Sequence, residues 1–353
     1  MKKLFVKAFL TAAMTVLAST AYSDNTITIN VTGVPYLHQV YKMLGDDFNS
    51  VEKRFLLKYI DENTNDFARK VASGSADFSV SDTAMSRMEL DARGLIQFPA
   101  MVTAIVPVVN LPGIESDNLI LDGPVLASIM SGEITKWNHE SISALNPNLI
   151  LPSTRIRPLA RSEASGATLA ITTYLAKKSS KFAKNVGVGE SVIWPNEVQL
   201  LHGGVAIDMA MSKIPGTITY IEMDVGNTKQ MKFVRLRHHT GPVVKADIGF
   251  LRSGVVSARA TEGGAANSLN TVDFASNWPI VLPIYITLPK RAMSDEKTAL
   301  ALRFIYWTFH KGDDTIEQSG LVPLPVLLQA LAVKVMRTVQ STNGGALTFN
   351  FDL

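Results

Sequence analysis

The segment of this chain best suited to chemistry is Arg161–Thr168, with the sequence RSEASGAT, followed by an alanine-rich helical pattern. Ser165 is a favourable N-cap residue. The first backbone N–H groups of a helix have no partner inside it and can therefore donate to an anion. Arg161 offers a bidentate guanidinium to the same anion, and Glu163 is placed to hold that guanidinium. The alternative is an ordinary capped helix beside a surface Arg–Glu pair, which is the simpler interpretation of these eight residues alone.

Strand and helix patterns alternate in the N-terminal part of the chain. Thr26–Val31 alternates apolar and polar residues, and Phe55–Ile60 and Phe78–Val80 are two further strand candidates. Helical spacing between them predicts a parallel α/β sheet. Ligands of such sheets bind at the carboxyl ends of the strands. The segments that fall at this edge are Gly33–Tyr36, Asn63–Asn65 and Ser81–Asp82.

The first 23 residues have the pattern of a secretory signal peptide. Lys2 and Lys3 precede an apolar run, and Ala21-Tyr22-Ser23 is a small-x-small cleavage pattern. We therefore expect an exported protein, soluble in the periplasm or secreted. Three of the 34 Lys and Arg residues lie in this leader, so the remainder balances the 31 Asp and Glu residues. The balance does not predict nucleic acid as a partner.

Cysteine is absent from the sequence. Its absence excludes disulfides, thiolate metal sites and a lipid attached to cysteine after the leader.

Further along the chain, Met101–Val109 is an apolar run, Val205–Met211 is predicted to be helical, and Ile218–Glu222 is strand-like. The segment Gly226–Ser276 is polar and poorly patterned.

The segment Leu121–Asn138, LDGPVLASIMSGEITKWN, resembles a stretch of periplasmic phosphate-binding proteins, the soluble receptors of high-affinity phosphate ABC importers. The similarity continues through the Arg161 loop and covers essentially the whole chain after the leader. The other segments that carry it are Leu145–Pro152, Trp194-Pro195, Lys213–Gly216, Tyr220–Glu222 and Trp278–Ile280.

The resemblance implies a two-lobed periplasmic binding protein of type II, in which each α/β lobe is a mostly parallel sheet flanked by helices. The ligand lies between the lobes, which close by hinge motion. The chain is expected to cross near Met101–Val106 and to return near Ile280–Ile284. The implied divisions are a signal peptide at 1–23, the first part of lobe I at 24–102, lobe II at 103–282 and the completion of lobe I at 283–353.

The resemblance also implies a ligand cage of hydroxyls, backbone N–H groups, one arginine and one aspartate. Arg161 matches the family arginine, Glu163 its acidic partner and Asp82 the family aspartate. Tyr36 takes the place of the family phenylalanine in a gap-free register. The implied phosphate-binding residues are Tyr36, Thr64, Asp82, Arg161, Ser165, Gly166 and Ala167.

Asp82 beside an anion makes sense if the ligand carries a proton. Phosphate near neutral pH can donate its P–OH hydrogen to a carboxylate, whereas sulfate has no hydrogen to donate and is repelled. Asp82 would thus select phosphate over sulfate. The alternative is that Asp82 is an N-cap or turn residue for the segment that follows it.

Three departures from the family pattern leave the ligand and its affinity open. The family's Gly-Ser-Ser-Gly-Gly turn is here Asn63–Phe67, and its Gly-Ala-Thr-Phe-Pro turn is Gly33–Leu37. Ala167 replaces a threonine, although its N–H remains. The first lobe therefore has fewer donors than the family standard.

Catalysis finds little support, because none of the hydrolase, nucleotide-binding or zinc-protease motifs is present. We predict a non-enzyme without cofactor or metal, with His238-His239 on an exposed edge. The leading hypothesis is a monomeric receptor that delivers inorganic phosphate to an inner-membrane ABC permease. The alternatives are a receptor of the same fold for another oxyanion, a secreted scavenger or sensor, and a secreted hydrolase.

Overall fold

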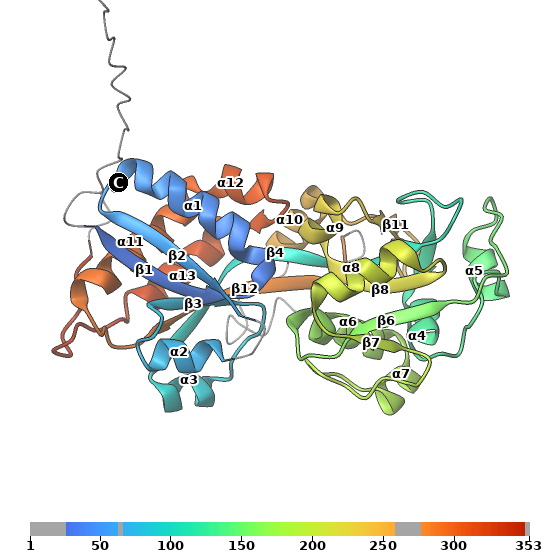
Figure 1. The fold of residues 1–353 in the computed structure, drawn as a ribbon, viewed down its shortest axis with the longest axis horizontal. Helices are drawn as coiled ribbons and strands as arrows, with labels where there is room; N and C mark the ends of the chain where they lie inside the picture. Colours follow the sequence, from blue (N-terminus) through green and yellow to red (C-terminus); the bar gives the residue numbers. More distant parts are fainter. Residues whose placement is uncertain (1–25, 63–65, 258–276, 350–353) are drawn as a thin grey trace, which may run out of the picture.

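The structure of the protein is a computed structural model that describes residues 26–62, 66–257 and 277–349. Figure 1 shows two lobes side by side, joined by long strands. The expected leader and Thr64 lie outside the described residues. Within the described residues, no helix is long and apolar enough to cross a membrane.

The first lobe is built on three parallel strands, as the sequence predicts. β1 (Ile27–Gly33) lies between β2 (Phe55–Asp61) and β3 (Phe78–Ser81). α1 (His38–Val51) buries an apolar face against this sheet because its apolar residues recur at helical spacing. The remaining elements of this lobe are η1 (Pro35–Leu37), α2 (Phe67–Ala72), α3 (Arg87–Arg93), α11 (Asp295–Lys311), α12 (Asp313–Gln318), β13 (Val322–Pro323) and α13 (Val326–Met336).

Two long strands connect the lobes (Figure 1). β4 (Leu95–Asn110) and β12 (Val281–Pro289) pair antiparallel, with a register shift between Ile284 and Tyr285. Every residue of β12 and nearly every residue of β4 is buried. A strand covered on both faces needs apolar residues at consecutive positions, which explains the apolar runs in the sequence.

The second lobe continues the same sheet from the far half of β4. β8 (Thr217–Glu222) pairs antiparallel with β4, β6 (Arg157–Arg161) runs parallel to β8, and β7 (Gln199–Leu201) pairs with β6 at the edge. The helices of this lobe are α4 (Gly123–Met130), α5 (Glu140–Leu145), α6 (Gly166–Lys178), α7 (Ser180–Asn185), α8 (Gly203–Lys213), α9 (Met223–Thr228) and α10 (Ile248–Ser257). The short strands are β5 (Ile120–Asp122), β9 (Lys232–Phe233), β10 (Arg235–Arg237) and β11 (Val243–Val244).

The segment that appears poorly patterned in the sequence contains several of these short elements. Strands of two or three residues are too short to show a period, so sequence patterns miss them. The prediction of an exposed edge is wrong for His238, which is 6 % exposed. His238 lies in the turn that joins β10 to β11, and its backbone N–H donates to Pro242 O at 2.7 Å. This turn holds the His238 side chain in a buried position.

Candidate anion-binding site at the lobe junction

α6 begins as the sequence predicts. Ser165 is its N-cap, and its Oγ accepts a hydrogen bond from the Thr168 backbone N–H at 3.1 Å. Ser165 Oγ also donates to Thr168 Oγ1 at 2.9 Å, and that oxygen lies 2.8 Å from Tyr220 Oη. Gly166 and Ala167 are buried in the first turn. This network holds the donor end of a 13-residue helix in one orientation.

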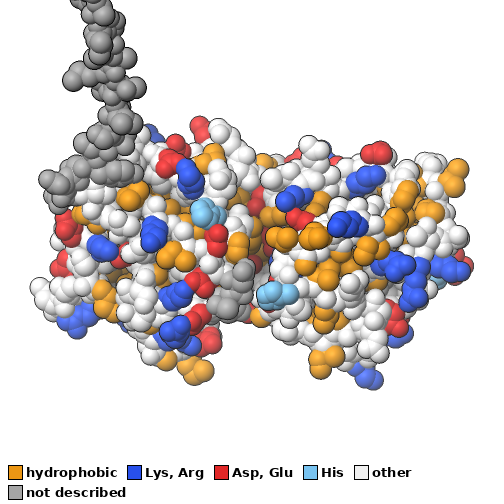
Figure 2. Space-filling model, viewed as in Figure 1, with side chains coloured by type: hydrophobic (Ala, Val, Ile, Leu, Met, Phe, Trp, Pro, Cys, Tyr) orange, Lys and Arg blue, Asp and Glu red, His pale blue; other side chains and the backbone are white. Residues whose placement is uncertain are grey.

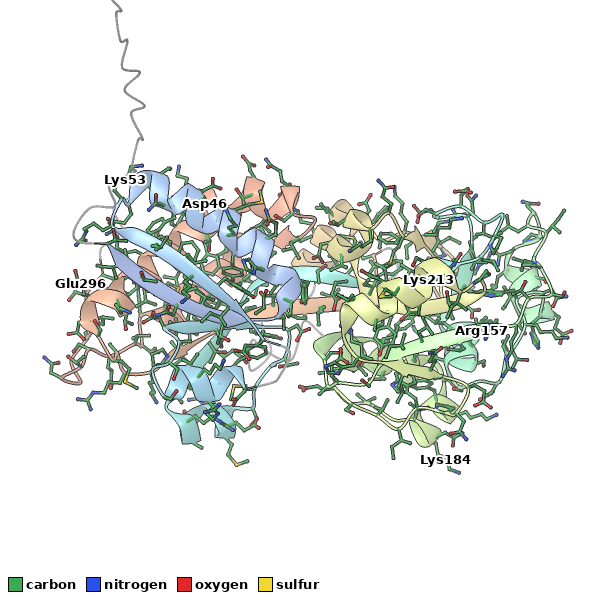
Figure 3. The ribbon with its side chains drawn as sticks, viewed as in Figure 1. Asp46, Lys53, Arg157, Lys184, Lys213 and Glu296 are labelled. Atoms are coloured by element: carbon green, nitrogen blue, oxygen red, sulfur yellow. The ribbon has the colours of Figure 1, made fainter. Side chains whose placement is uncertain are left out.

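Arg161 is held by an acidic residue that the sequence did not single out. Its Nη2 lies 2.9 Å from both carboxylate oxygens of Glu222. Arg161 and Glu222 end the neighbouring parallel strands β6 and β8, so their side chains meet at the same sheet edge. Figure 3 shows Arg157, the first residue of β6, on the outer side of the second lobe, away from the junction.

Glu163 is the more distant acidic partner of Arg161. Its Oε1 lies 3.5 Å from Arg161 Nη1, and its carboxylate accepts the Gly203 backbone N–H at 3.1 and 3.2 Å. Glu163 therefore ties the guanidinium to the start of α8, while Glu222 makes the closer contact. Arg161 Nε is buried and has no hydrogen-bond partner, so this N–H remains available to a ligand.

Asp82 of the first lobe lies directly against the start of α6 in the second lobe. A Cβ atom added to Gly166 would lie 2.7 Å from Asp82 Cγ and 2.2 Å from Asp82 O, so only glycine fits here. Burial, together with the nearby Glu222 carboxylate, raises the pKa of Asp82 to about 6. The Arg161 guanidinium and the Gly166 backbone N–H act in the opposite direction on the pKa.

Tyr36 in η1 brings a hydroxyl to the same region. Its Oη is buried and has no hydrogen-bond partner. Burial raises the pKa of Tyr36 well above its usual value, and the carboxylates of Asp82, Glu222 and Asp224 raise it further. The hydroxyl therefore keeps its proton and is a potential donor.

Asp224, which follows β8 on α9, is a second acidic residue that sequence patterns missed. It is 7 % exposed, and its Oδ1 accepts a hydrogen bond from Thr103 Oγ1 of β4 at 3.0 Å. Burial raises the pKa of Asp224 to about 7, and the nearby Glu222 carboxylate contributes. The sequence signals for Glu222 are its place at the end of a predicted strand and in the Tyr220–Glu222 segment that resembles the family, whereas Asp224 has neither signal.

The structure thus brings together most of the predicted site residues. Tyr36 and Asp82 from the first lobe and Arg161 from the second share electrostatic contacts, and Ser165, Gly166 and Ala167 form the adjoining helix start. Thr64 lies outside the described residues. The described part of the chain holds no group of three or more His, Asp or Glu side chains placed to bind a metal ion.

The fold and the site define a class of protein, the two-lobed α/β binding proteins that hold a ligand where their lobes meet. A family model described as the PBP superfamily domain matches residues 19–311. The phosphate-binding protein PstS of Xylella fastidiosa strain Temecula1 is 30% identical over 309 residues, which cover 86% of this chain and 84% of that protein. PstS of Haemophilus influenzae strain Rd is 33% identical over 258 residues, covering 73% of this chain and 77% of that protein. The chain belongs to the family of PstS phosphate-binding proteins.

A solved structure supports the same fold. The high-affinity periplasmic phosphate-binding protein PfluDING, determined with bound phosphate, superimposes with a TM-score of 0.69 at 20% identity, covering 92% of this chain and 97% of that one. At this level of sequence identity, the likeness of the two structures shows a shared fold and nothing more. The predicted fold class and the family resemblance are therefore both confirmed.

Proposed function

We propose that this protein is an exported receptor that captures inorganic phosphate between its lobes and delivers it to an inner-membrane ABC permease. One observation carries the proposal. The guanidinium of Arg161 and the start of α6 in the second lobe meet Asp82 of the first lobe. This juxtaposition supplies donors for an oxyanion together with an acceptor for its proton.

In the proposed complex, Arg161 supplies the main positive charge through its Nε–H and Nη groups. The Ala167 backbone N–H donates to the same oxyanion. The Gly166 N–H and the Ser165 hydroxyl join it when the ligand displaces their present acceptors, Asp82 and Thr168 Oγ1. Tyr36 donates from the first lobe. We assign Thr64 as a further hydroxyl donor on the family resemblance.

Asp82 has the proposed role of accepting the P–OH hydrogen. Its burial at the lobe junction supports this role, because a local turn residue would be expected at the surface. Arsenate, which also carries a proton near neutral pH, is expected to bind, and sulfate is expected to be rejected.

The same proposal includes the division of the chain. Residues 24–102 and 283–353 form one lobe, 103–282 form the other, and 1–23 are a cleaved leader. Closure follows from bending of β4 and β12 where they pass between the lobes. We propose a soluble periplasmic monomer without catalytic activity, cofactor or nucleic-acid partner. On the face shown in Figure 2, acidic and basic side chains are interspersed over both lobes. A nucleic-acid-binding protein would instead show a continuous basic patch, so this face supports the proposal that nucleic acid is not a partner.

Calorimetric titration of the mature protein with phosphate, arsenate and sulfate tests the proposal. We expect phosphate and arsenate to compete for one site per chain, and sulfate to give no heat of binding. Sulfate binding as tight as phosphate binding would favour the alternative receptor for another oxyanion. Release of phosphate from an aryl phosphate ester by the purified protein would favour the hydrolase alternative.

A further inference from the structure

The first-lobe end of the proposed site depends on a single short turn. η1 follows β1 directly and brings the Tyr36 hydroxyl near the carboxylates of the lobe junction. Val34 is the N-cap residue of this turn, and its apolar side chain cannot cap it. Pro35 lacks a backbone N–H group. A turn of three residues has few hydrogen bonds of its own, so contacts from outside it decide how firmly it is held.

Tyr59 of β2 supplies such a contact. Its hydroxyl donates to the Val34 backbone carbonyl at 2.9 Å, and the same carbonyl accepts the Leu37 backbone N–H at 3.2 Å. The Tyr59 side chain is therefore attached to the carbonyl whose hydrogen bond closes the turn. Val34 and Tyr59 are 25 positions apart, and they meet because β1 and β2 are parallel neighbours in the sheet.

The Tyr59 hydroxyl also lies directly on the backbone of Gly33, the last residue of β1. A Cβ atom added to Gly33 would overlap Tyr59 Oη and would lie 2.8 Å from Val80 O. A larger side chain at this position would displace the hydroxyl from the Val34 carbonyl. Glycine thus allows the tyrosine to reach across the end of the strand.

The first turn of α1 packs against the ring of Tyr59. The ring centroid of His38 lies 5.2 Å from that of Tyr59, and His38 Nδ1 lies 2.9 Å from Asp61 Oδ1 at the end of β2. Ring contacts of this kind limit the orientations open to the tyrosine. Burial raises the pKa of Tyr59 well above its usual value, so the hydroxyl keeps its proton and remains a donor.

Building on the phosphate-receptor function proposed above, we propose that Tyr59 is a positioning residue for phosphate binding. Its hydroxyl fixes the Val34 carbonyl, and this carbonyl fixes the turn from which the Tyr36 hydroxyl donates to the oxyanion. Tyr59 itself does not contact the ligand. Tyr36 needs this support because its buried Oη has no hydrogen-bond partner among the described residues. Its direction is therefore set through the backbone of the turn.

The simpler alternative is that the Tyr59 hydroxyl only satisfies a backbone carbonyl of the first lobe. Tyr59 would then contribute to folding, and any effect on affinity would not depend on Tyr36. The two explanations differ in how variants combine. Two residues that act through one another have non-additive effects, whereas independent residues have additive effects.

The test is phosphate calorimetry on the mature protein and on Tyr59→Phe, which keeps the ring and removes the hydroxyl. We expect the variant to bind phosphate about three- to tenfold more weakly, which is the scale of one lost hydrogen bond. Tyr59→Phe added to Tyr36→Phe should give no further loss, because the hydroxyl that Tyr59 positions is already gone.

Tyr41→Phe is the matched control. The Tyr41 ring lies 5.8 Å from that of Tyr59, and its buried hydroxyl has no hydrogen-bond partner among the described residues. Removal of this hydroxyl should therefore leave the affinity for phosphate unchanged.

Equal affinities of Tyr59→Phe and the unmodified protein would overturn the proposal, and a fall in thermal stability without a fall in affinity would assign Tyr59 to folding alone. The same loss of affinity with and without the Tyr36 hydroxyl would also overturn it, because the effect would then bypass Tyr36. Absence of phosphate binding by the unmodified protein would instead overturn the proposed function, and the inference with it.

Discussion

Asp82 and Gly166 belong to different lobes, yet the Asp82 carboxyl occupies the space that a side chain on Gly166 would fill. The separation between Asp82 Cγ and an added Gly166 Cβ would be 2.7 Å, and Asp82 O would lie closer still. Real carbon atoms do not approach this closely without a shift of the backbone. The tight fit means that this contact between the lobes depends on glycine at the start of α6.

Gly166→Ala should therefore weaken phosphate binding by keeping the lobes apart. Overpacking of this kind costs about 1–3 kcal/mol, which corresponds to roughly 5- to 150-fold in affinity. Calorimetry and thermal unfolding measure the two effects separately. Gly204→Ala on α8 is the control, because an added Cβ there meets no atom within 4 Å. Equal affinities of the two variants would contradict the predicted closure.

Arg161→Met should abolish most phosphate binding and also destabilise the protein. Removal of the guanidinium leaves the Glu222 carboxylate buried and unpaired, and breaking such a pair typically costs about 3–5 kcal/mol of folding free energy. The double variant Arg161→Met with Glu222→Gln should recover much of the stability and none of the affinity. Urea unfolding and phosphate titration distinguish these effects. Recovery of binding in the double variant would show that Arg161 is not the anion ligand.

Asp82→Asn should allow sulfate to bind. The amide removes the repulsion and supplies a donor, so discrimination against an oxyanion without a proton is lost. Competition titration with sulfate and phosphate measures the change. Asp77→Asn is a suitable control, because Asp77 accepts the Asn30 backbone N–H at 2.7 Å within the same lobe. Sulfate binding by Asp77→Asn or by the unmodified protein would argue against a selective role for Asp82.

The unliganded protein should lose stability as the pH rises from about 4 to about 7. Burial raises the pKa of Asp82 to about 6 and that of Asp224 to about 7, so the folded state binds more protons than the unfolded state in this interval. Each unit of pKa shift corresponds to about 1.4 kcal/mol, so the two shifts together correspond to about 7 kcal/mol, complete once the pH exceeds both folded pKa values.

Denaturant unfolding at a series of pH values tests this expectation. Asp224→Asn should flatten the decline in the free energy of unfolding, most clearly between about pH 5 and 7. Glu140→Gln, an exposed change, should leave the decline intact. A stability that rises steadily with pH over this interval would mean that neither carboxyl is buried as described.

Local sequence patterns determined the elements that supply the donors. Ser165 begins α6 because its hydroxyl satisfies an N–H that the helix leaves free, and this requires only neighbouring residues. Alternation and helical spacing likewise predict β1, α1 and the parallel arrangement of the first three strands. These features follow from residues within a few positions of one another.

Tertiary structure alone decided how charge is distributed at the site. Glu163, two positions from Arg161, was the expected partner. Glu222, 61 positions away, makes the closer contact, with both carboxylate oxygens near Nη2, because β6 and β8 are sheet neighbours. Asp224 reaches Thr103 across 121 positions for a similar reason. Strand order places such residues together, and strand order depends on how the whole chain buries its apolar runs rather than on any local pattern.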